Sequence, residues 1–479
     1  MLFNSIGFAI FFLIVFVLYW TAFGKKYKIQ NILLLISSYY FYGCWNCHFL
    51  ILLIFSTSLD YFTGLMMSDT LDKRKRQLWF WLSVCVNLGF LAIFKYYNFF
   101  VDSFADLLST FGIKGNLTTL QVILPVGISF YTFHGLSYVI DIYYGRIKPE
   151  RNFINYSVFV CFFPLLVAGP IERATHLLPQ ITRERTFDYT KAVDGLRQIL
   201  WGLFKKIVIA DNCASIVNPI FDNYHTQSSS NLLLGAILFA FQIYGDFSGY
   251  SDIALGTARL LGIELLRNFG FPYFSRDIAE FWRRWHISLT TWFRDYLYIP
   301  LGGSRGTKWQ SVRNTFIIFL VSGLWHGANW TFIFWGAFHA ALFMPLLIFG
   351  RNRLYTNTVA EGKFLPSIKE FTQMLTTFSL VILGWIFFRS TSLKDAFGYI
   401  ISLFSHSIFT MPTHKVSTLS VYIFSLMLFE WIQRERKHGL SQIESIIKLQ
   451  PLRWGIYIFL IISIIQFGGK SETFIYFQF

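Results

Sequence analysis

Charged residues are scarce in this sequence. Asp, Glu, Lys and Arg make up 14% of its 479 residues, whereas a soluble domain contains about 25%. Hydrophobic residues make up 54%, so the composition excludes an ordinary soluble domain and favours a chain with many membrane spans. The net charge is +15, but no basic soluble module is visible, which argues against nucleic-acid binding. Basic loops that face anionic membrane lipids explain this charge more simply.

Cysteines and familiar catalytic motifs are also few. Of the five cysteines, only Cys44 and Cys47 have CxxC spacing, and no βαβ pattern surrounds them, so a redox or metal role is not favoured. The chain contains no GxSxG elbow, no P-loop and no HExxH motif. A serine nucleophile, nucleotide hydrolysis and zinc catalysis therefore lack support. We expect no metal site and no bound cofactor.

Long apolar stretches fill most of the chain. A spanning helix needs about 20 apolar residues, and several stretches are too short or too long for one helix, so we expect about eleven spans. Together they predict one all-α polytopic membrane domain over residues 1–479, with re-entrant or interfacial helices. The stretches lie near residues 7–23, 31–66, 78–100, 121–143, 155–171, 198–217, 231–262, 314–350, 375–388, 396–409, 417–432 and 453–467.

The basic residues near the N-terminus predict its orientation. No basic residue precedes the first apolar run, and Lys25 and Lys26 follow it, so it resembles a retained span rather than a cleaved signal. The positive-inside rule places these lysines and the basic residues 74–76 inside, and the turn at 44–48 outside. Met1 is therefore expected outside the cytoplasm.

Residues 264–311 are too polar for a simple span. Aromatic and apolar residues recur there at helical spacing and predict one amphipathic helix that lies at the interface or re-enters the membrane. The glycine-rich residues 301–306 are typical of a turn at membrane depth, which is tolerated where it is buried or lines a cavity. The residues at helical spacing are Phe281, Trp285, Leu289, Trp292, Phe293 and Tyr296.

One histidine lies inside a run of 37 residues, 314–350, that contains no acid or base other than histidine. As a single helix this run would be about 55 Å long, against a hydrocarbon core of about 30 Å. Gly323, Gly327 and Asn329 cluster beside His326 and predict a break there. His326 is then either a structural histidine bonded to a backbone carbonyl or a general base that faces a cavity.

Other histidines are weaker candidates. His286 lies beside Arg283 and Arg284 and is either an interfacial residue or one that orients a donor or assists proton transfer. His339 lies 13 residues after His326 and would face another direction on a straight helix, so we expect it to pack. His134 is also expected to be structural.

Two further features of the sequence leave alternatives open. Asp246 and Asp252 lie between apolar stretches; they are either functional or pair with an arginine such as Arg259. The C-terminal tail, residues 468–479, is rich in aromatic side chains where a loose polar end is usual. It either packs on the bundle or enters the active cavity and presents the Tyr476 hydroxyl.

Several motifs in order resemble the membrane-bound O-acyltransferase (MBOAT) family. They lie at residues 281–286, 294–296, 300–304 and 323–327. Residues 124–130, 168–171 and 246–252 resemble the branch that acts on cell-envelope polysaccharides, to which the alginate O-acetyltransferase membrane subunit belongs. The resemblance covers nearly the whole chain.

The resemblance implies a helical bundle around a tunnel, with a re-entrant catalytic region near residues 264–350. It implies that His326 is catalytic, that His286 is a second functional position and that Tyr476 is a candidate acyl relay. A cytoplasmic thioester, acetyl-CoA or an acyl-carrier thioester, would be the donor. The residues expected to contact substrates are Arg283, Arg284, Trp325, Asn329 and Asp246.

The same resemblance implies a multi-pass protein of the cytoplasmic (inner) membrane that O-acetylates a cell-envelope or extracellular polysaccharide. The expected partners are membrane lipids, the polysaccharide and an extracytoplasmic acetyltransferase of the SGNH type. The alternatives are D-alanyl transfer to teichoic acid-type polymers, a lipid acyltransferase of the same family, and a non-enzymatic transporter. The sequence shows no paired interrupted helices in matching halves, which disfavours the transporter.

Overall fold

The computed structural model describes residues 1–24, 26–113, 118–120, 123–167, 169–468 and 472–475. Within these ranges every regular element is a helix, which confirms the all-α prediction. The chain divides into two compact units. Unit 1 contains residues 1–189 and 258–266, and unit 2 contains residues 190–257 and 267–479.

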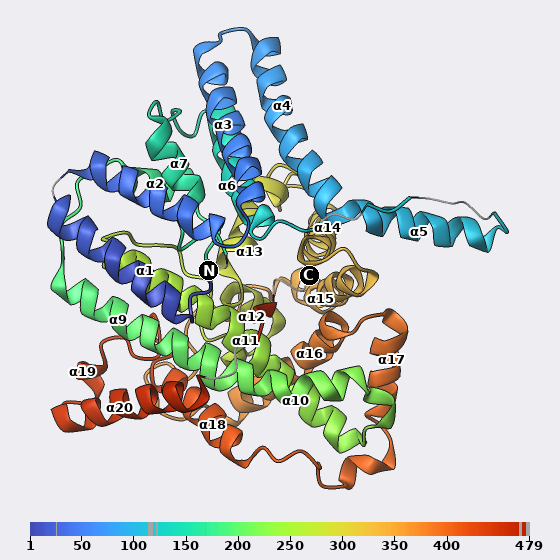
Figure 1. Cartoon of the computed structure of the whole chain (residues 1–479). Helices are drawn as coiled ribbons and strands as arrows, with labels where there is room; N and C mark the ends of the chain where they lie inside the picture. Colours follow the sequence, from blue (N-terminus) through green and yellow to red (C-terminus); the bar gives the residue numbers. More distant parts are fainter. Residues whose placement is uncertain (25, 114–117, 121–122, 168, 469–471, 476–479) are drawn as a thin grey trace. The chain divides into compact units, whose positions relative to one another are not determined.

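Unit 1 is built from helices that the apolar stretches largely predicted. Helices α3, α4 and α6 lie side by side (Figure 1). The elements are α1 (Ile6–Val17), η1 (Leu18–Ala22), α2 (Tyr27–Gly43), α3 (Cys47–Asp69), α4 (Lys73–Leu91), η2 (Ala92–Tyr96), α5 (Tyr97–Thr110), α6 (Ile128–Tyr143), α7 (Phe153–Cys161) and α8 (Ala174–Ile181).

Buried polar contacts hold these helices together. The Asp60 carboxylate on α3 accepts hydrogen bonds from Ser83 (2.6 Å) and Asn87 (2.7 Å) on α4. The His134 ring is fully buried, and its Nε2 accepts the backbone N–H of Glu172 at 3.0 Å. This contact agrees with the structural role predicted for His134, because a buried ring nitrogen needs a partner.

Unit 2 contains the histidines that the sequence singled out. Its elements are α9 (Tyr189–Leu203, whose first residue belongs to unit 1), η3 (Phe204–Ala210), α10 (Asp211–Asp222), η4 (Tyr224–Thr226), α11 (Ser229–Leu260, whose last three residues belong to unit 1), η5 (Pro272–Phe274), α12 (Ile278–Arg284), α13 (Ile287–Phe293), η6 (Arg294–Tyr298), α14 (Lys308–His326), α15 (Trp330–Ile348), α16 (Ile368–Arg389), α17 (Leu393–Ser402), η7 (His406–Phe409), α18 (Ser417–Ile432), α19 (Ile443–Ile446) and α20 (Gln450–Phe467).

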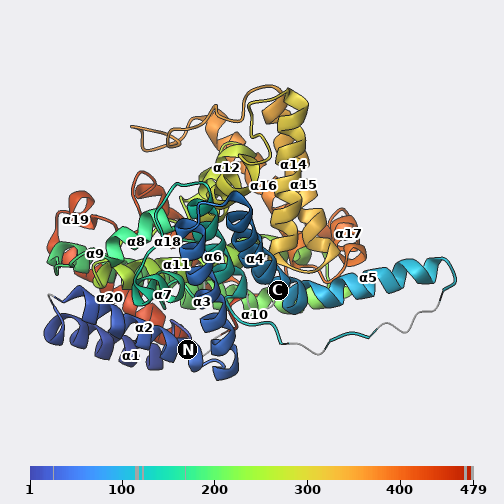
Figure 2. The same cartoon turned by 90° about the horizontal axis from the view of Figure 1, so that it is seen from above.

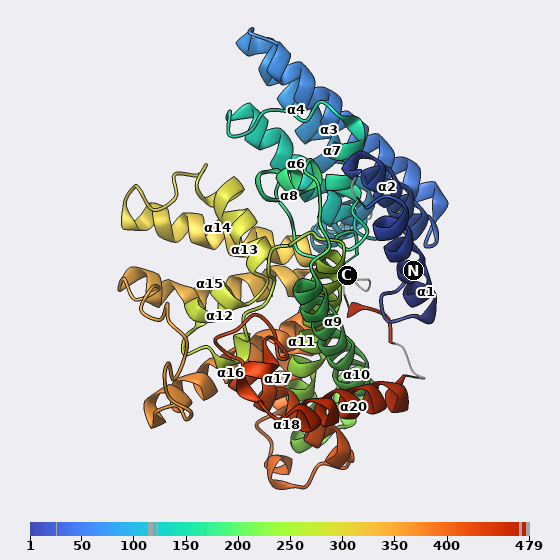
Figure 3. The ribbon, with the colours of Figure 1, turned by 90° about the vertical axis from the view of Figure 1, so that its left-hand side faces the viewer.

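Helices α14 and α15 form a tightly packed antiparallel pair (Figure 2). A Cβ atom added to Gly323 would lie 2.2 Å from the backbone oxygen of Phe332, and one added to Gly336 would lie 2.3 Å from that of Phe319. The backbones therefore approach too closely for any side chain at these two positions. Helix α16 lies against the other side of α15 (Figure 3).

Six helices among the described residues are long and apolar enough to cross a membrane. They are Cys47–Asp69, Lys73–Thr110, Ser229–Leu260, Trp330–Ile348, Ile368–Arg389 and Gln450–Phe467, and Ile6–Ala22 and Ser417–Ile432 are shorter apolar helices. The total of about eleven spans stays a prediction.

Two stretches counted among the apolar runs do not form long helices. The stretch 155–171 is helical only as far as Cys161, and 396–409 only as far as Ser402 before a short 3₁₀ turn. Residues 162–167 are buried inside the protein, so an apolar stretch continues past the end of α7 without forming a helix.

Candidate active site

His326 is the last residue of α14, and the helix backbone orients its ring. The His326 Nδ1 atom lies 2.6 Å from the carbonyl oxygen of Ser322, one turn earlier in the same helix. A carbonyl can only accept, so Nδ1 carries the hydrogen and Nε2 is the basic nitrogen. His326 therefore makes the hydrogen bond to a backbone carbonyl that a structural histidine would make. The same hydrogen bond leaves Nε2 as the basic nitrogen, as a general base requires.

Aromatic side chains surround this imidazole. The centroid of the His326 ring lies 5.0 Å from those of Trp325 and Trp335 and 5.6 Å from that of Phe388. The side chain is buried. This apolar enclosure keeps bulk water away from the ring, which suits a proton transfer from a hydroxyl.

The predicted break beside His326 is confirmed. Helix α14 ends at His326 and α15 begins at Trp330, with Asn329 as its N-cap. The Asn329 side chain accepts the N–H of Thr331 (3.0 Å) and donates to the carbonyl of Thr391 (3.1 Å). Asn329 thus begins α15 and ties it to the end of α16; its predicted contact with substrate stays a prediction.

His286 lies where the sequence predicted a continuous helix, and that prediction is wrong. The chain breaks between α12 and α13, and His286 adopts the left-handed conformation with φ 45°. The Ile287 N–H donates to the carbonyl of Asn268 (2.9 Å), and the Ser288 hydroxyl donates to the Asn268 side chain (2.5 Å). These contacts with a distant loop override the helical periodicity.

The two histidines meet in the structure. The centroid of the fully buried His286 ring lies 6.3 Å from that of His326, 5.9 Å from that of Trp325 and 4.7 Å from that of Phe247. Burial, aided by the neighbouring His326, lowers the pKa of His286 well below its ordinary value. Because its pKa is lowered, the His286 ring is neutral at physiological pH. His286 lies outside the six apolar helices named above.

His339 is separated from His326 by the ring of Trp335. The Trp335 ring centroid is 5.0 Å from that of His326 and 5.1 Å from that of His339. A Cβ atom on Gly384 would lie 2.7 Å from the His339 ring, so α16 packs directly against it. These contacts fit the packing role predicted for His339.

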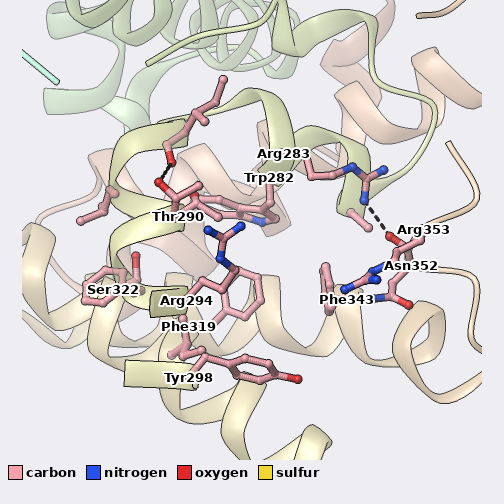
Figure 4. Close-up of a pocket in the computed structure, with 16 residues that line it drawn as sticks. Trp282, Arg283, Thr290, Arg294, Tyr298, Phe319, Ser322, Phe343, Asn352 and Arg353 are labelled. Atoms are coloured by element: carbon pink, nitrogen blue, oxygen red, sulfur yellow. Dashed lines mark hydrogen bonds between the residues drawn. The ribbon is translucent and has the colours of Figure 1, made fainter. Parts of the chain in front are cut away.

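A cavity of about 450 Å³ lies beside α14. His326 does not line it, but Ser322, whose carbonyl accepts from His326, does, and at the loop after α15 Asn352 and Arg353 line it. Three arginines surround it, Arg283, Arg294 and Arg353 (Figure 4). Its volume falls in the range of about 300–1,000 Å³ that is common for small-molecule sites.

The arginines around this cavity differ in their partners. Arg283 donates to the carbonyls of Asn352 and Tyr355, both at 2.6 Å, and so holds the loop that carries Arg353. Arg284 lies outside the lining and pairs with Glu280 at 2.6 Å. In the part of the chain that the structure describes, Arg353 has no acidic partner. Sequence reasoning missed Arg353, because a loop arginine far from the motif gives no local signal.

Asp246 forms a buried ion pair, but not with the arginine that we expected. Its carboxylate lies 2.7 Å from Nζ of Lys206 on η3, while Lys205 pairs with Asp252 at 2.5 Å. The suggested partner, Arg259, pairs with Glu264 instead. The two adjacent lysines within an otherwise apolar stretch were the sequence feature that could have predicted these ion pairs.

This ion pair also holds the C-terminal tail. Lys206 Nζ donates to the carbonyl of Glu472 (3.1 Å), and the Asp246 carboxylate accepts the N–H of Ile475 (2.6 Å). The Phe474 side chain is fully buried, with its ring centroid 4.4 Å from that of Tyr250. The expectation that the tail docks is thus confirmed for residues 472–475.

The docked tail lies close to the histidine pair. The ring centroid of Phe474 is 6.4 Å from that of Phe247, which in turn contacts His286. The proposed relay residue Tyr476 falls outside the described residues. Within the described ranges no three His, Cys, Asp or Glu side chains gather at a distance that could hold a metal ion.

Comparison with known proteins identifies the family. The sequence pattern of MBOAT, the membrane-bound O-acyltransferase family, matches residues 149–375. The chain is 41% identical to the probable alginate O-acetylase AlgI of Pseudomonas aeruginosa over 406 residues, which cover 85% of this chain and 75% of that protein. The chain belongs to the membrane-bound O-acyltransferase family.

Other relatives are named for different activities. The peptidoglycan O-acetyltransferase of Helicobacter pylori is 35% identical over 78% of this chain and 74% of its own length. The teichoic acid D-alanyltransferase of Bacillus subtilis is 30% identical over 55% of this chain and 68% of its own length. The chain is therefore a multi-pass membrane protein and an O-acyltransferase.

The contacts of the tail generate a prediction. We expect Lys206→Met to release residues 472–475, because it removes both the partner of Asp246 and the donor to Glu472. Hydrogen–deuterium exchange of the C-terminal peptide should then speed up by about tenfold or more, since protection reflects local opening. Lys205→Met is the matched control, because it breaks a neighbouring buried pair without touching the tail. Unchanged exchange in Lys206→Met would contradict the prediction.

Proposed function

We propose that this protein moves an acetyl group from a cytoplasmic thioester across the membrane for O-acetylation of a cell-envelope or extracellular polysaccharide. The observation that carries the proposal is the pairing of His326, with Nε2 as its basic nitrogen, and an arginine-lined cavity that Ser322 also lines. The relatives named for acetylation of alginate and peptidoglycan cover more of the chain than the D-alanyltransferase does, which favours acetyl transfer.

The distribution of basic residues supports a cytoplasmic opening of the cavity. Arg353 lines one end of the cavity, and the segments before α14 and before α16 on that side carry four basic residues: Arg305, Arg351, Arg353 and Lys363. At the opposite ends of α14 and α16 the neighbouring chain carries few, among them Arg389 and Lys394. By the positive-inside rule, we expect the cavity mouth on the cytoplasmic side of the membrane and the break after His326 nearer the outer side.

The proposed chemistry uses the geometry around His326. Its Nε2 takes the proton of an acceptor hydroxyl as the hydroxyl oxygen attacks the thioester carbonyl. The carbon–sulfur bond then breaks, and the leaving thiolate takes the proton back from the imidazolium. The Ser322 carbonyl stabilises the ring through Nδ1–H in both states. Trp325 and His286 hold and shield the reacting groups, which limits competing attack by water.

His326→Ala should lower acetyl transfer by about 10²- to 10⁴-fold, the range expected for loss of a general base. The measurement is release of CoA from acetyl-CoA by the purified protein, together with mass spectrometry of envelope polymers from cells. His339→Gln is the matched control, because His339 lies in the same aromatic cluster without the Ser322 contact. Wild-type activity in a folded His326→Ala protein would refute the assignment.

Arg353 is proposed to bind the phosphates of the donor. Arg353→Ala should raise KM for acetyl-CoA about fivefold, as expected for one partly screened charge pair, while kcat stays unchanged. Acetyl-pantetheine, which lacks the nucleotide phosphates, should be used equally well by both proteins. Lys363→Ala, in the same loop but outside the cavity lining, is the control. An equal loss with both donors would mean that Arg353 does not contact phosphate.

Tyr476 is proposed as an acyl relay, a role supported by the docking of the preceding residues beside the histidine pair. Its hydroxyl would attack the thioester and release the thiol, and an acceptor hydroxyl outside would then displace the tyrosine from the ester. Tyr476→Phe removes only the hydroxyl and should abolish polysaccharide acetylation. In the wild-type protein, the C-terminal peptide should carry an acetyl group after exposure to acetyl-CoA, and full transfer by Tyr476→Phe would exclude the relay.

The other expectations from the sequence stay predictions. They are an extracytoplasmic SGNH-type acetyltransferase that completes the transfer, and roles for Asn329, Arg284 and Asp246 at the substrates. The buried pair formed by Asp246 favours a role in holding the tail. D-alanyl transfer is the alternative activity; mass spectrometry of the envelope polymers distinguishes it by the mass that is lost.

A further inference from the structure

Unit 2 has a further cavity, lined by several polar side chains, at the C-terminal end of α16. Its volume is about 240 Å³. The end of α10, the short η4 turn, the end of α16 and the start of α17 line it. The side chains that matter for its chemistry are Tyr224, His225, Arg389, Thr391 and Asp395.

This cavity adjoins the histidine site through two direct connections. Phe388 packs against the His326 ring at 5.6 Å, and the very next residue, Arg389, lines the cavity. The carbonyl of Thr391, another lining residue, accepts a hydrogen bond from the Asn329 side chain at the start of α15. The arginine-lined cavity is lined instead by Asn352 and Arg353, which follow the other end of α15. The two cavities therefore lie near opposite ends of α15.

The lining combines aromatic faces with donors and acceptors. The Tyr224 ring lies 3.8 Å from the His225 ring, centroid to centroid, and its hydroxyl donates to Asp395 at 3.5 Å. The Asp395 carboxylate also accepts from the Thr391 hydroxyl at 2.7 Å. A sugar ring needs this mixture, because its C–H faces pack on aromatic rings while its hydroxyls both donate and accept.

The charges at the cavity mouth are partly paired. Arg389 donates to Asn218 (3.1 Å) and lies 3.4 Å from Asp222, whose side chain is 59% exposed, so the acidic end of this ion pair opens to solvent. His225 is also exposed. A volume of 240 Å³ is below the range of about 300–1,000 Å³ for drug-sized ligands. It suits one sugar unit of a polymer rather than a nucleotide thioester.

We propose that this cavity is a saccharide subsite, which binds one sugar unit of the acceptor near the opposite end of α15 from the arginine-lined cavity. The assignment of that sugar as the acceptor rests on the proposed function, whereas the binding of a saccharide does not. The subsite would hold the polymer where the acyl group leaves, and the Arg389 guanidinium would favour a sugar that carries a carboxylate.

The experiment uses the full-length protein in lipid nanodiscs and two probes, a tetramer of a uronic acid and a tetramer of N-acetylglucosamine. Binding is measured by thermophoresis, and CoA release from acetyl-CoA is measured on the same samples. Thr391→Trp fills the cavity from an exposed position while keeping the backbone carbonyl that Asn329 uses. Lys394→Ala is the control, since Lys394 is exposed nearby but does not line the cavity.

We expect saturable binding of at least one tetramer by the wild-type and Lys394→Ala proteins, and binding about tenfold weaker or more in Thr391→Trp. CoA release without acceptor should be unchanged in both variants. If neither tetramer binds, or if Thr391→Trp binds as tightly as wild type, the subsite is refuted. If the tetramer binds but the wild-type protein releases no CoA, the proposed function fails while the subsite stands.

Discussion

The close approach of α14 and α15 determines where His326, the proposed general base, lies. Gly323 and Gly336 let the two backbones touch, and the chain must then reverse within the few residues after His326. A reversal inside an apolar bundle leaves backbone groups that need partners. Asn329 supplies one of them by capping α15, and the turn leaves His326 at the end of a helix, facing other protein groups.

The second constraint is electrostatic. Lys205 and Lys206 are buried, and a buried lysine is stable only when its charge is matched. Asp252 matches Lys205, whereas Asp246 and Asp211 both pair with Lys206. The backbone of residues 472–475 completes the group around Lys206. Residues 472–475 of the tail are thus part of the polar core of unit 2. Their position near His286 follows from their contacts with Lys206 on η3 and its partner Asp246.

The sequence predicted some of these features well and others poorly. The break at Gly327 and Asn329 was predictable because a run of 37 residues is too long for one span and the helix-breaking residues cluster at one point. The break at His286 was not, because the surrounding aromatic residues keep helical spacing across it. Contacts with Asn268, which is distant in the sequence but close in space, interrupt the helix there. The lysine partners of the two aspartates were missed for a similar reason, since pairing between helices leaves no periodic signal.

The left-handed backbone at His286 has a consequence for how this position can change. A non-glycine residue there costs on the order of 1–3 kcal/mol, and glycine would relieve that cost but remove the imidazole. Under the proposed role of His286 at the site, stability and activity therefore favour different residues at this position. Variants selected only for a more robust fold should tend to lose the histidine, whereas variants selected for turnover should keep it and recover stability elsewhere in the helix packing.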